Sequence, residues 1–537
     1  MRIARPDPWT LGAAAIAVLV LLPILAVIAI AFRPTENIWP HLMATVLPGY
    51  LANTLILMAG VGGLTGAAGT GAAWLLTVYR FPGARLLSGL MLLPLAVPAY
   101  VGAYALVDFL DYSGPVQGGL RAAFGWHSAR DYWFPHIRSR TGAVLVLSAA
   151  LTPYVYLLAR TAFREQSGGM LEVARALGAR PWRVFFRVGL PLARPAIAAG
   201  MALAMMETVN DFGVVDYFAV QTLTTGVVTT WVSGGNAGGA AQIASVILAL
   251  VLVLVALERA SRRRGRRDAG ARPPRPLVPQ PLPGARGWLA AGLCLLPILA
   301  GFALPVAVMA GHALISTGQT TPGLGRALVN TLTTAGGAAV LTVAGAVFLV
   351  YGVRLSGRML PRLVLPVTGI GYAAPGAVLA VGILLPLARF DHWLADGVQA
   401  ATGHDPGLLL TGTAVAIVYA YVLRFFAIGQ GAVDAAFARI PPALPMAARS
   451  LGRGPGGTLR AVHLPLMRGT VGTALLLIFV DGAKELPATL LLRPFNYQTL
   501  ATRVHERASL ENLTDAAPAA LLVTGVGLVA VALLARR

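Results

Sequence analysis

The sequence has little of what a soluble enzyme uses for charge, metal binding or covalent chemistry. Only 12% of its 537 residues are charged, which is about half the usual fraction for a soluble protein. One cysteine, Cys294, excludes an intrachain disulfide and a cysteine metal site. No two of the eight histidines have the i, i+4 spacing of a helical metal site. The only lysine, Lys484, lies between Ala483 and Glu485, which excludes a G-x4-G-K-[ST] loop for the phosphates of ATP.

Apolar residues make up 57% of the sequence and come in long blocks, such as 11–32 and 243–257. About 20 apolar residues cross a bilayer as a helix, because a spanning segment must pair its own backbone polar groups. The first block follows Arg2 and Arg5 and ends with Ala-Ile-Ala at 29–31, so a cleaved signal peptide is an alternative. That block is longer than a signal core of about 7 to 15 residues, and we expect a retained helix. The sequence therefore predicts an all-α polytopic membrane protein.

The expected spans are about twelve and form two sets of six. The first six centre near residues 20, 64, 96, 152, 205 and 249, and the second six near 300, 340, 376, 418, 480 and 525. Residues 1–258 then form one half and residues 287–537 the other. Three features recur 277 positions apart: Asn-Thr-Leu at 53–55 and 330–332, Gln-Thr-Leu at 221–223 and 498–500, and a proline at 98 and 375. Six spans per half make both copies enter the membrane in the same direction, so we predict parallel repeats.

Residues 259–286 separate the two halves and contain nine arginines and six prolines. Such a segment cannot bury apolar surface or continue a helix through its prolines, so we expect a solvated linker. Nearly half of the net charge of +21 is concentrated here beside a membrane span, which favours contact with the lipid bilayer over nucleic acid. The positive-inside rule then places the linker and both chain termini in the cytoplasm.

A polar loop is repeated as well. It reads EVARALGARPWRVFFRVGLP at 172–191 and MAARSLGRGPGGTLRAVHLP at 446–465, and eight of these twenty positions are identical. Gly178 and Gly452 are suited to end a helix, and Pro181 and Pro455 to begin the next one. We therefore expect a short cytoplasmic helix, a turn and a second helix within residues 164–194 and 430–468. An ordinary basic loop would explain the arginines but not a glycine and a proline repeated at one spacing.

This loop resembles that of ABC importer permeases, in which a short cytoplasmic helix docks into a cleft of the ATPase subunit. The residues that carry the resemblance are Glu172, Ala174, Gly178, Leu190 and Pro191 in the first copy and Ala448, Gly452, Leu464 and Pro465 in the second. Met446 stands where the family has glutamate. We therefore expect the first loop to contribute more than the second to ATPase binding.

Two further segments, ETVNDFGVVDYFAVQTLTTGV at 207–227 and KELPATLLLRPFNYQTLATRVHE at 484–506, resemble those of fused ferric iron permeases. This resemblance covers nearly the whole chain and implies the two-half fold of a type I ABC importer permease in a bacterial inner membrane. It implies iron(III) as the cargo, a periplasmic binding protein as the donor, and a separate ATPase homodimer that binds ATP and magnesium. The chain itself would hold no cofactor and no catalytic residue.

Other substrates and one other class of protein remain open. Thiamine, sulfate, phosphonate and polyamine permeases share the loop, so it indicates an importer more firmly than it indicates iron. A secondary transporter driven by an ion gradient is also built from parallel repeats. The repeated cytoplasmic loop argues against that second alternative.

Ionisable residues at membrane depth are costly and are therefore candidates for the transport pathway. With a fifth span that begins near residue 195, Glu207 and Asp211 lie about 18 Å and 24 Å along it. The eleventh span supplies Asp481, Lys484 and Glu485. Four carboxylates are a suitable lining for a hard cation, although no metal ligand is assigned. The alternative is that Lys484 pairs with a neighbouring carboxylate and the group only packs the helix ends.

Overall fold

The computed structural model describes residues 8–34, 36–166, 168–265, 277–316, 322–356, 365, 368 and 374–535. Among these residues, eleven helical segments are long and apolar enough to cross a membrane. A twelfth candidate is the helix pair Ala84–Ala96 and Ala99–Phe124, which is bent by 95°. The predicted all-α fold with about twelve membrane helices is confirmed.

The long helices follow the apolar blocks. They are α1 (Pro8–Phe32), α3 (Leu47–Val78), α7 (Arg140–Glu165), α10 (Leu190–Asn210), α13 (Ala237–Gly265), α14 (Ala285–Ile298) with α15 (Leu304–Ile315), α16 (Leu324–Ser356), α18 (Gly376–Thr402), α19 (Ala414–Ala438), α22 (Leu464–Ala483) and α25 (Leu513–Ala535). The short helices are α2 (Trp39–Ala44), α4 (Ala84–Leu90), α5 (Ala99–Leu110), α6 (Pro115–Phe124), α8 (Gly168–Ala176), α9 (Pro181–Val184), α11 (Gly213–Tyr217), α12 (Leu223–Val228), α20 (Ala443–Ser450), α21 (Pro455–Thr458), α23 (Pro487–Leu492) and α24 (Leu500–Ser509).

Two of the predicted span centres, 96 and 376, are wrong in detail. Val97 is extended, with φ −93° and ψ 124°, and Pro98 and Pro375 each stand just before the first residue of a helix, α5 and α18. Proline has no N–H and forces the residue before it out of the helical region, so a helix does not run through it unbroken here. The expected third span is therefore a bent pair. In the described part of the expected ninth span, helix α18 starts at Gly376, the residue that was placed at the centre.

The chain divides into two compact units that do not coincide with the sequence halves. Unit 1 contains Met1–His41, Gly226–Leu248 and Pro322–Arg503, and unit 2 contains Leu42–Thr225, Ala249–Thr321 and Val504–Arg537. In unit 1 the N-terminal helix α1 packs against α16 and α18 of the second half. In unit 2, α15 packs against α5 of the first half and against α25. Each unit thus joins the central helices of one half to terminal helices of the other.

Small residues let the helices of unit 2 approach closely. A side chain on Gly69 of α3 would come within 2.9 Å of the backbone nitrogen of Tyr156. A side chain on Gly200 of α10 would come within 2.7 Å of Cα of Val155. Both glycines therefore allow α3 and α10 to lie against the backbone of α7. Helices in a membrane gain stability from such close van der Waals packing, because lipid supplies no hydrophobic driving force between them.

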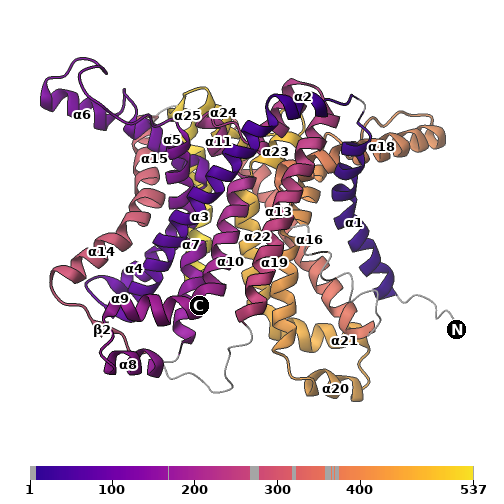
Figure 1. Cartoon of the computed structure of the whole chain (residues 1–537). Helices are drawn as coiled ribbons and strands as arrows, with labels where there is room; N and C mark the ends of the chain where they lie inside the picture. The colour runs from indigo at the N-terminus through magenta and orange to yellow at the C-terminus, as the bar shows by residue number, and fades with distance from the viewer. Residues whose placement is uncertain are drawn as a thin grey trace. The chain divides into compact units, whose positions relative to one another are not determined.

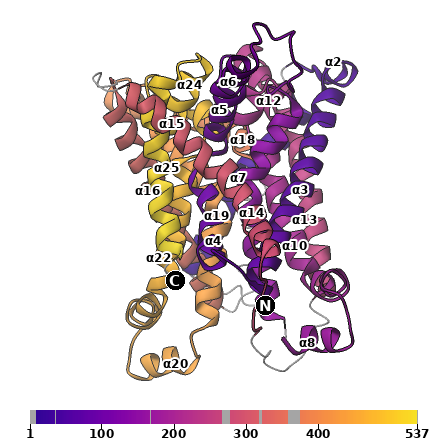
Figure 2. The same cartoon turned by 90° about the vertical axis from the view of Figure 1, so that its left-hand side faces the viewer.

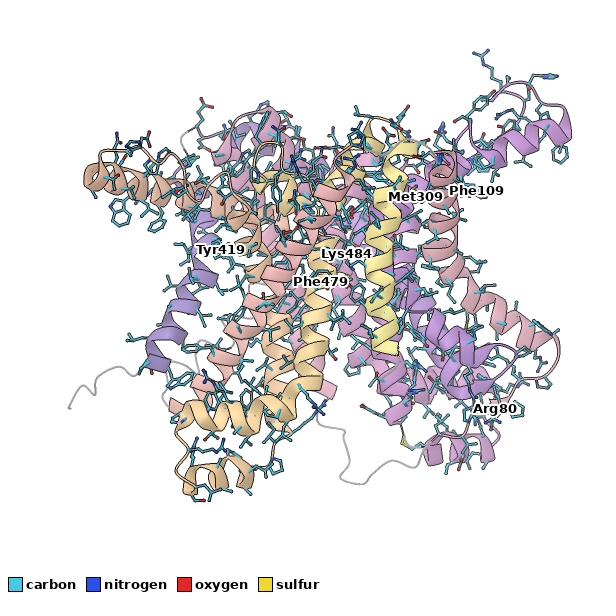
Figure 3. All side chains as sticks on the ribbon, turned by 180° about the vertical axis from the view of Figure 1, so that it is seen from behind. Arg80, Phe109, Met309, Tyr419, Phe479 and Lys484 are labelled. Atoms are coloured by element: carbon cyan, nitrogen blue, oxygen red, sulfur yellow. The ribbon has the colours of Figure 1, made fainter. Side chains whose placement is uncertain are left out.

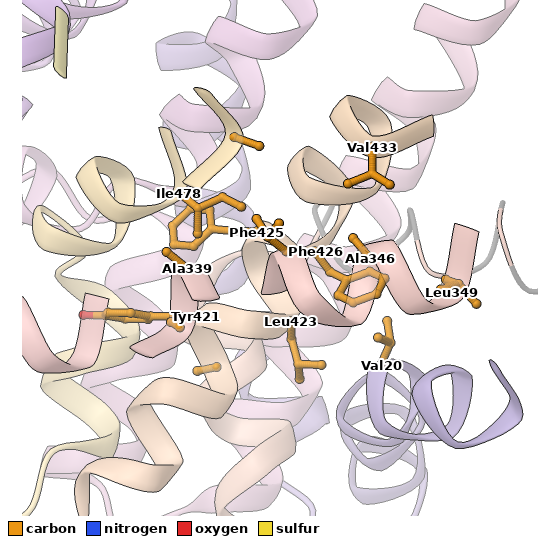
Figure 4. Close-up of a cluster of buried hydrophobic side chains, with 14 of the residues drawn as sticks. Val20, Ala339, Ala346, Leu349, Tyr421, Leu423, Phe425, Phe426, Val433 and Ile478 are labelled. Carbon is orange, nitrogen blue, oxygen red and sulfur yellow. The ribbon is translucent and has the colours of Figure 1, made fainter. Parts of the chain in front are cut away.

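The core of unit 1 lies between α16, α19 and α22, with α1 and α18 against it (Figure 4). Ala346 and Phe426 are almost fully buried, and Val20 of α1 reaches the same cluster (Figure 4). Tyr421 and Ile478 extend the cluster toward the start of α23. The apolar core of unit 1 is thus formed by helices from both sequence halves.

The recurring Asn-Thr-Leu and Gln-Thr-Leu motifs contact each other in each unit. In unit 2 the side-chain amide of Asn53 donates to the carbonyl of Gln221 at 2.8 Å, and in unit 1 Asn330 donates to the carbonyl of Gln498 at 2.9 Å. The hydroxyls of Thr54 and Thr331 likewise accept from the backbone N–H groups of Leu223 and Leu500, at 3.1 Å and 2.8 Å. The predicted repeat is therefore confirmed at the level of single hydrogen bonds.

The linker between the halves is more ordered at its ends than predicted. Helix α13 continues to Gly265, and Gln280–Pro281 (β2) pairs in parallel with Tyr79–Arg80 (β1). The N–H of Leu282 donates to the carbonyl of Arg80 at 2.8 Å. Both residues of β2 are exposed, so this short pairing is compatible with a solvated linker, and the linker over 259–286 stays a prediction. Residues 266–276 of the predicted linker lie outside the described residues.

The repeated loops lie at one end of the long helices in each unit. In unit 2, α8 and α9 lie at one end of α7 and α10, whereas α6 lies at the other end (Figure 1). In unit 1, α20 lies at the end where α22 begins (Figure 2). Each unit therefore offers an exposed residue at both ends: Leu177 and Trp133 in unit 2, and Leu451 and Phe495 in unit 1.

These four residues test the predicted orientation. In a chain carrying Cys294→Ala, we expect Trp133→Cys and Phe495→Cys to react with an impermeant maleimide added to intact cells. Leu177→Cys and Leu451→Cys should react only after the membrane is permeabilised, because the positive-inside rule predicts that the arginine-rich ends face the cytoplasm. All four side chains are at least 82% exposed, so accessibility within the protein does not limit the reaction. External labelling at Leu177→Cys or Leu451→Cys would contradict the orientation.

Candidate functional site

The repeated loops have the same backbone geometry, which accounts for their repeated residues. In the first loop, Gly178 has φ +79° and its N–H donates to the carbonyl of Arg175, while the N–H of Ala179 donates to the carbonyl of Ala174. These two bonds form a Schellman motif, in which a glycine in the left-handed region ends the helix. Pro181 then opens α9 at a position where no N–H is needed.

The second loop repeats this geometry. Gly452 has φ +80° and its N–H donates to the carbonyl of Arg449, and the N–H of Arg453 donates to the carbonyl of Ala448. Pro455 opens α21 as Pro181 opens α9. The repeated alanine, arginine, glycine and proline are therefore the residues that shape one turn.

Both loops continue into a long helix through a wider, π-helical turn. The N–H of Leu190 bonds to the carbonyl of Phe185, and that of Leu464 to the carbonyl of Leu459, each five residues earlier. Pro191 and Pro465 follow directly and have no N–H to donate. A proline frees a carbonyl of the preceding turn, and a π-helical turn commonly accompanies such a break.

An aromatic cluster holds each π turn against its unit, with different residues in the two copies. In unit 2, Trp74 packs edge-on against Phe163 at 5.1 Å, and the space beside its ring is occupied by Gly189, which has no side chain to displace it. In unit 1, the counterpart of Trp74 is Tyr351, which contacts His463 and Phe437 at 5.4 Å and 5.9 Å. The hydroxyl of Tyr351 also donates to the carbonyl of Pro455 at 2.6 Å.

The loops leave apolar side chains exposed at the turn. Leu177 is 83% exposed and its counterpart Leu451 is 82% exposed. Met170 and Val173 of α8, and Leu444 and Met446 of α20, are exposed as well. Glu172 is also exposed, in the position that corresponds to Met446. A short helix with exposed apolar residues and a rigid turn is a suitable surface for a partner protein.

Two of the predicted pathway residues, Asp211 and Glu485, lie just before short helices and cap them. Oδ1 of Asp211, at the end of α10, accepts from the backbone N–H groups of Val214 and Val215 at 2.9 Å and 3.2 Å. The carboxylate of Glu485, at the end of α22, accepts from the N–H groups of Ala488 and Thr489, each at 3.2 Å. Each carboxylate therefore caps the helix that follows it, α11 or α23, as a side-chain oxygen does at a helix N-terminus.

Glu485 has a further role, because it also pairs with an arginine. Its Oε1 lies 2.8 Å from Nη1 of Arg424, and the residue is only 4% exposed. Arg424 belongs to α19, and its counterpart in the first half is Ala150. A buried ion pair is stabilising only when both partners are present, so this pair ties α19 to the start of α23.

Asp481 and Lys484 pair with each other, as the structural alternative predicts. Nζ of Lys484 lies 2.8 Å from Oδ1 of Asp481, and both side chains are about a quarter exposed. Figure 3 labels Lys484 at the end of α22. The counterparts of these two residues in the first half are Glu207 and Asn210, so the first half has a carboxylate but no lysine at this place.

A polar network in unit 2, which runs from a buried tyrosine to an exposed aspartate, was missed by the sequence analysis. The hydroxyl of Tyr104 lies 2.9 Å from Nδ1 of His505, whose Nε2 lies 3.7 Å from Oδ2 of Asp216. Tyr104 is fully buried and His505 is 8% exposed, whereas the side chain of Asp216 is 43% exposed. The counterparts of the three residues in the other copy are Val381, Val228 and Leu490. A comparison of the two copies for positions that are polar in only one would have found them.

The described residues hold no group of three or more histidine, cysteine, aspartate or glutamate side chains that is arranged to bind a metal ion. The carboxylates of Asp211, Asp481 and Glu485 instead accept hydrogen bonds or pair with cations at the ends of α10 and α22. These three carboxylates therefore each have a partner at a helix end, and their assignment to a transport pathway stays a prediction.

The sequence is similar to a known transport protein along nearly its whole length, and to others along part of it. Residues 66–267 match the family described as binding-protein-dependent transport system inner membrane component. The chain is 26% identical over 532 residues to the Fe(3+)-transport system permease protein FbpB 2 of Haemophilus influenzae, which covers 97% of this chain and 96% of that protein.

Two other relatives match part of the chain. The molybdenum transport system permease protein ModB of Escherichia coli is 31% identical over 183 residues, which are 32% of this chain and 74% of ModB. The sulfate transport system permease protein CysT of Escherichia coli is 32% identical over 147 residues, which are 27% of this chain and 50% of CysT. The chain therefore belongs to the family of binding-protein-dependent transport system inner membrane components, as a fused two-half permease that spans the inner membrane many times and is a non-enzymatic transport subunit.

Proposed function

We propose that the chain is the transmembrane permease of an ATP-driven importer that moves ferric iron from a periplasmic binding protein into the cytoplasm. The observation that carries this proposal is the similarity to the Fe(3+) permease FbpB 2, which extends over 97% of the chain and so includes both halves. The molybdenum and sulfate relatives match about a third of the chain or less.

Two identical ATPase subunits are the partners that fit the repeated loops. Each loop presents the same Schellman turn with an exposed leucine, Leu177 or Leu451, beside a short helix. Two equivalent surfaces suit two copies of one protein, which would bind ATP and magnesium. Both loops lie at the arginine-rich ends of their units, which the positive-inside rule assigns to the cytoplasm, where ATP is available.

The carboxylates of the first half are the groups proposed to attract the cation. Their second-half counterparts are matched by positive charge, because Lys484 pairs with Asp481 and Arg424 pairs with Glu485. The first half has Asn210 and Ala150 where these two cations stand. Glu207 and Asp211 thus place two carboxyl groups near the end of α10, and carboxylate oxygens are the ligands that a hard cation prefers.

An oxyanion importer is the second candidate, because specific observations favour it. Lys484 and Arg424 place two cations at the end of α22, and relatives that are named for molybdenum and sulfate transport match part of the chain. Anionic substrates prefer arginine, lysine and backbone N–H groups. The two candidates differ in whether the first-half acids or the second-half cations determine transport.

The first test concerns the Schellman turn of each repeated loop. A side chain at Gly178 meets no atom within 4 Å, so Gly178→Arg strains only the left-handed turn, by about 1–2 kcal/mol. We expect this strain to weaken binding of the ATPase by about tenfold, measured as ATPase copurified with the tagged permease. Gly452→Arg should have a smaller effect, because Met446 replaces the glutamate of the first loop.

Asparagine provides the matched control, since it tolerates the left-handed region. Gly178→Asn and Gly452→Asn should therefore retain most of the ATPase. Equal losses from the two arginine variants would contradict the asymmetry, and full retention in both would contradict docking at these turns.

The second test separates charge from capping at the end of α10. Asn caps a helix about as well as Asp, so Asp211→Asn removes the charge and keeps the start of α11. We expect Asp211→Asn and Glu207→Gln each to lower iron uptake several-fold, because the cation then meets less negative charge. Uptake is measured with radioactive iron in cells, and the amount of assembled complex is measured in parallel.

The double variant Asp481→Asn with Lys484→Gln is the matched control in the second half, because it removes an ion pair and leaves the net charge unchanged. It should lower uptake less than Glu207→Gln does. Normal iron uptake by assembled Glu207→Gln, Asp211→Asn and Glu485→Gln would assign these residues to structure alone. Stimulation of the ATPase by a sulfate- or molybdate-loaded binding protein, but not by an iron-loaded one, would replace the iron proposal by the oxyanion candidate.

A further inference from the structure

Unit 2 has an apolar cavity of about 560 Å³ at the ends of α5 and α7 that are remote from the first loop. Gly102 and Leu106 of α5, Leu145 and Ala149 of α7, and Ala300 of the turn between α14 and α15 line it. The segment 133–139, which leads into α7, closes one side. Phe109, near this end of α5, is labelled in Figure 3. The volume lies within the range of about 300–1,000 Å³ that ligand cavities occupy.

The fold does not require this cavity, because the other copy of the repeat fills the same place. The counterparts of Gly102 and Ala149 in unit 1 are Leu379 and Leu423, which are each 1% exposed. The counterpart of Leu145 is Tyr419, whose hydroxyl donates to the carbonyl of Leu19 of α1 at 2.6 Å. Smaller side chains at three positions therefore open in unit 2 a space that large side chains occupy in unit 1.

A second, polar cavity of about 330 Å³ adjoins the first and shares Ser139 with it. Its wall includes Arg138 and Arg140. Nη1 of Arg140 donates to Oδ1 of Asn53 at 3.4 Å, and Arg138 lies 3.0 Å from the exposed carboxylate of Glu511. Arg138 and Arg140 outnumber Glu511, the one carboxylate that pairs with Arg138, so these three groups carry a net positive charge at the polar cavity.

The positive charge is also specific to unit 2. The counterparts of Arg138 and Arg140 in the other copy are Gly412 and Ala414. The copy with the cavity therefore also has the arginines, and the copy without the cavity has neither. An apolar site and a basic site that occur together suit one amphiphilic ligand better than two separate ones.

The surroundings identify the source of such a ligand. Leu145 is 53% exposed on a helix that spans the membrane, so acyl chains of the bilayer reach the cavity from the side. Trp133 is 86% exposed beside the cavity, and tryptophan is enriched at the level of lipid headgroups. Arginine binds phosphate oxygens through paired N–H groups.

We propose that unit 2 holds one anionic glycerophospholipid, with an acyl chain in the apolar cavity and its phosphate at Arg140 and Arg138. The lipid would brace the start of α7 against the segment 218–221, whose residues line the polar cavity. That segment includes Gln221, which Asn53 already holds. The lipid is thus a structural ligand of the end of unit 2 that is remote from the ATPase-binding loop.

The test is native mass spectrometry of the purified full chain in detergent, with added phosphatidylglycerol or phosphatidylcholine. We expect wild-type protein to retain one phosphatidylglycerol. Arg140→Ala should lower this retention about fivefold, since a basic residue near a headgroup contributes about 1 kcal/mol, and should leave the weaker phosphatidylcholine signal unchanged. The charge control is Arg326→Ala, an exposed arginine near the start of α16 in unit 1.

The double variant Gly102→Leu with Ala149→Leu fills the cavity with the residues of unit 1 and should abolish retention of either lipid. Gly336→Leu, on a part of α16 where a side chain meets no atom within 4 Å, is its control. Size-exclusion chromatography shows whether each variant is folded. If the double variant does not fold, Arg140→Ala still tests the proposal, because it leaves the cavity unchanged. The proposal would be overturned if wild type and Arg140→Ala each retained as much phosphatidylglycerol as phosphatidylcholine. Loss of bound phosphatidylglycerol on addition of millimolar inorganic phosphate would also overturn it, in favour of a free-anion site.

Discussion

The structure depends on one constraint: in lipid, each backbone N–H and C=O has to find its partner within its own segment. The long helices satisfy this constraint along their lengths. Where a helix ends, its last backbone groups and those of the next segment need other partners. At the ends of α10 and α22 the next N–H groups are taken by the carboxylates of Asp211 and Glu485. These two carboxylates therefore supply the hydrogen bonds that the backbone needs where one helix ends and the next begins. A residue at such a place has a structural role before it has any role in transport.

The two copies of the repeat serve as controls for each other. Hydrogen bonds that occur in both, such as those of Asn53 and Asn330, belong to the fold. Features that occur in one copy only are where the halves specialise. Arg424 and Lys484 neutralise the second half, whereas Tyr104, His505 and Asp216 make unit 2 polar where unit 1 has valine and leucine. A fused chain can carry such asymmetry because its halves are free to diverge, unlike two copies of one subunit.

The sequence predicted the helices and the repeat because hydropathy and turn residues are local properties. The glycine and proline of the repeated loop specify a Schellman turn and a helix start, and the structure has both. It did not predict the bend at Pro98, because a hydropathy window averages across the proline. It also did not predict the capping role of Asp211, the pairing of Glu485 with Arg424, or the exchange of helices between the compact units. Those features depend on which distant segments meet, and a local pattern does not contain that information.

The same helix joins the two parts of the candidate site in each unit. Helix α10 runs from Leu190, just after the first loop, to Asn210, just before Asp211, and α22 makes the same connection in the second copy. Each helix is about 30 Å long at 1.5 Å per residue. At the loop end, aromatic side chains hold the π turn, so a displacement of the turn also moves the start of the helix. At the other end, the carboxylate that caps the next short helix follows directly. A packed helix transmits such a displacement because its core is close-packed and resists compression. If the proposed partner binds at the loop, this helix therefore offers a physical route by which its binding would displace the carboxylate at the opposite end.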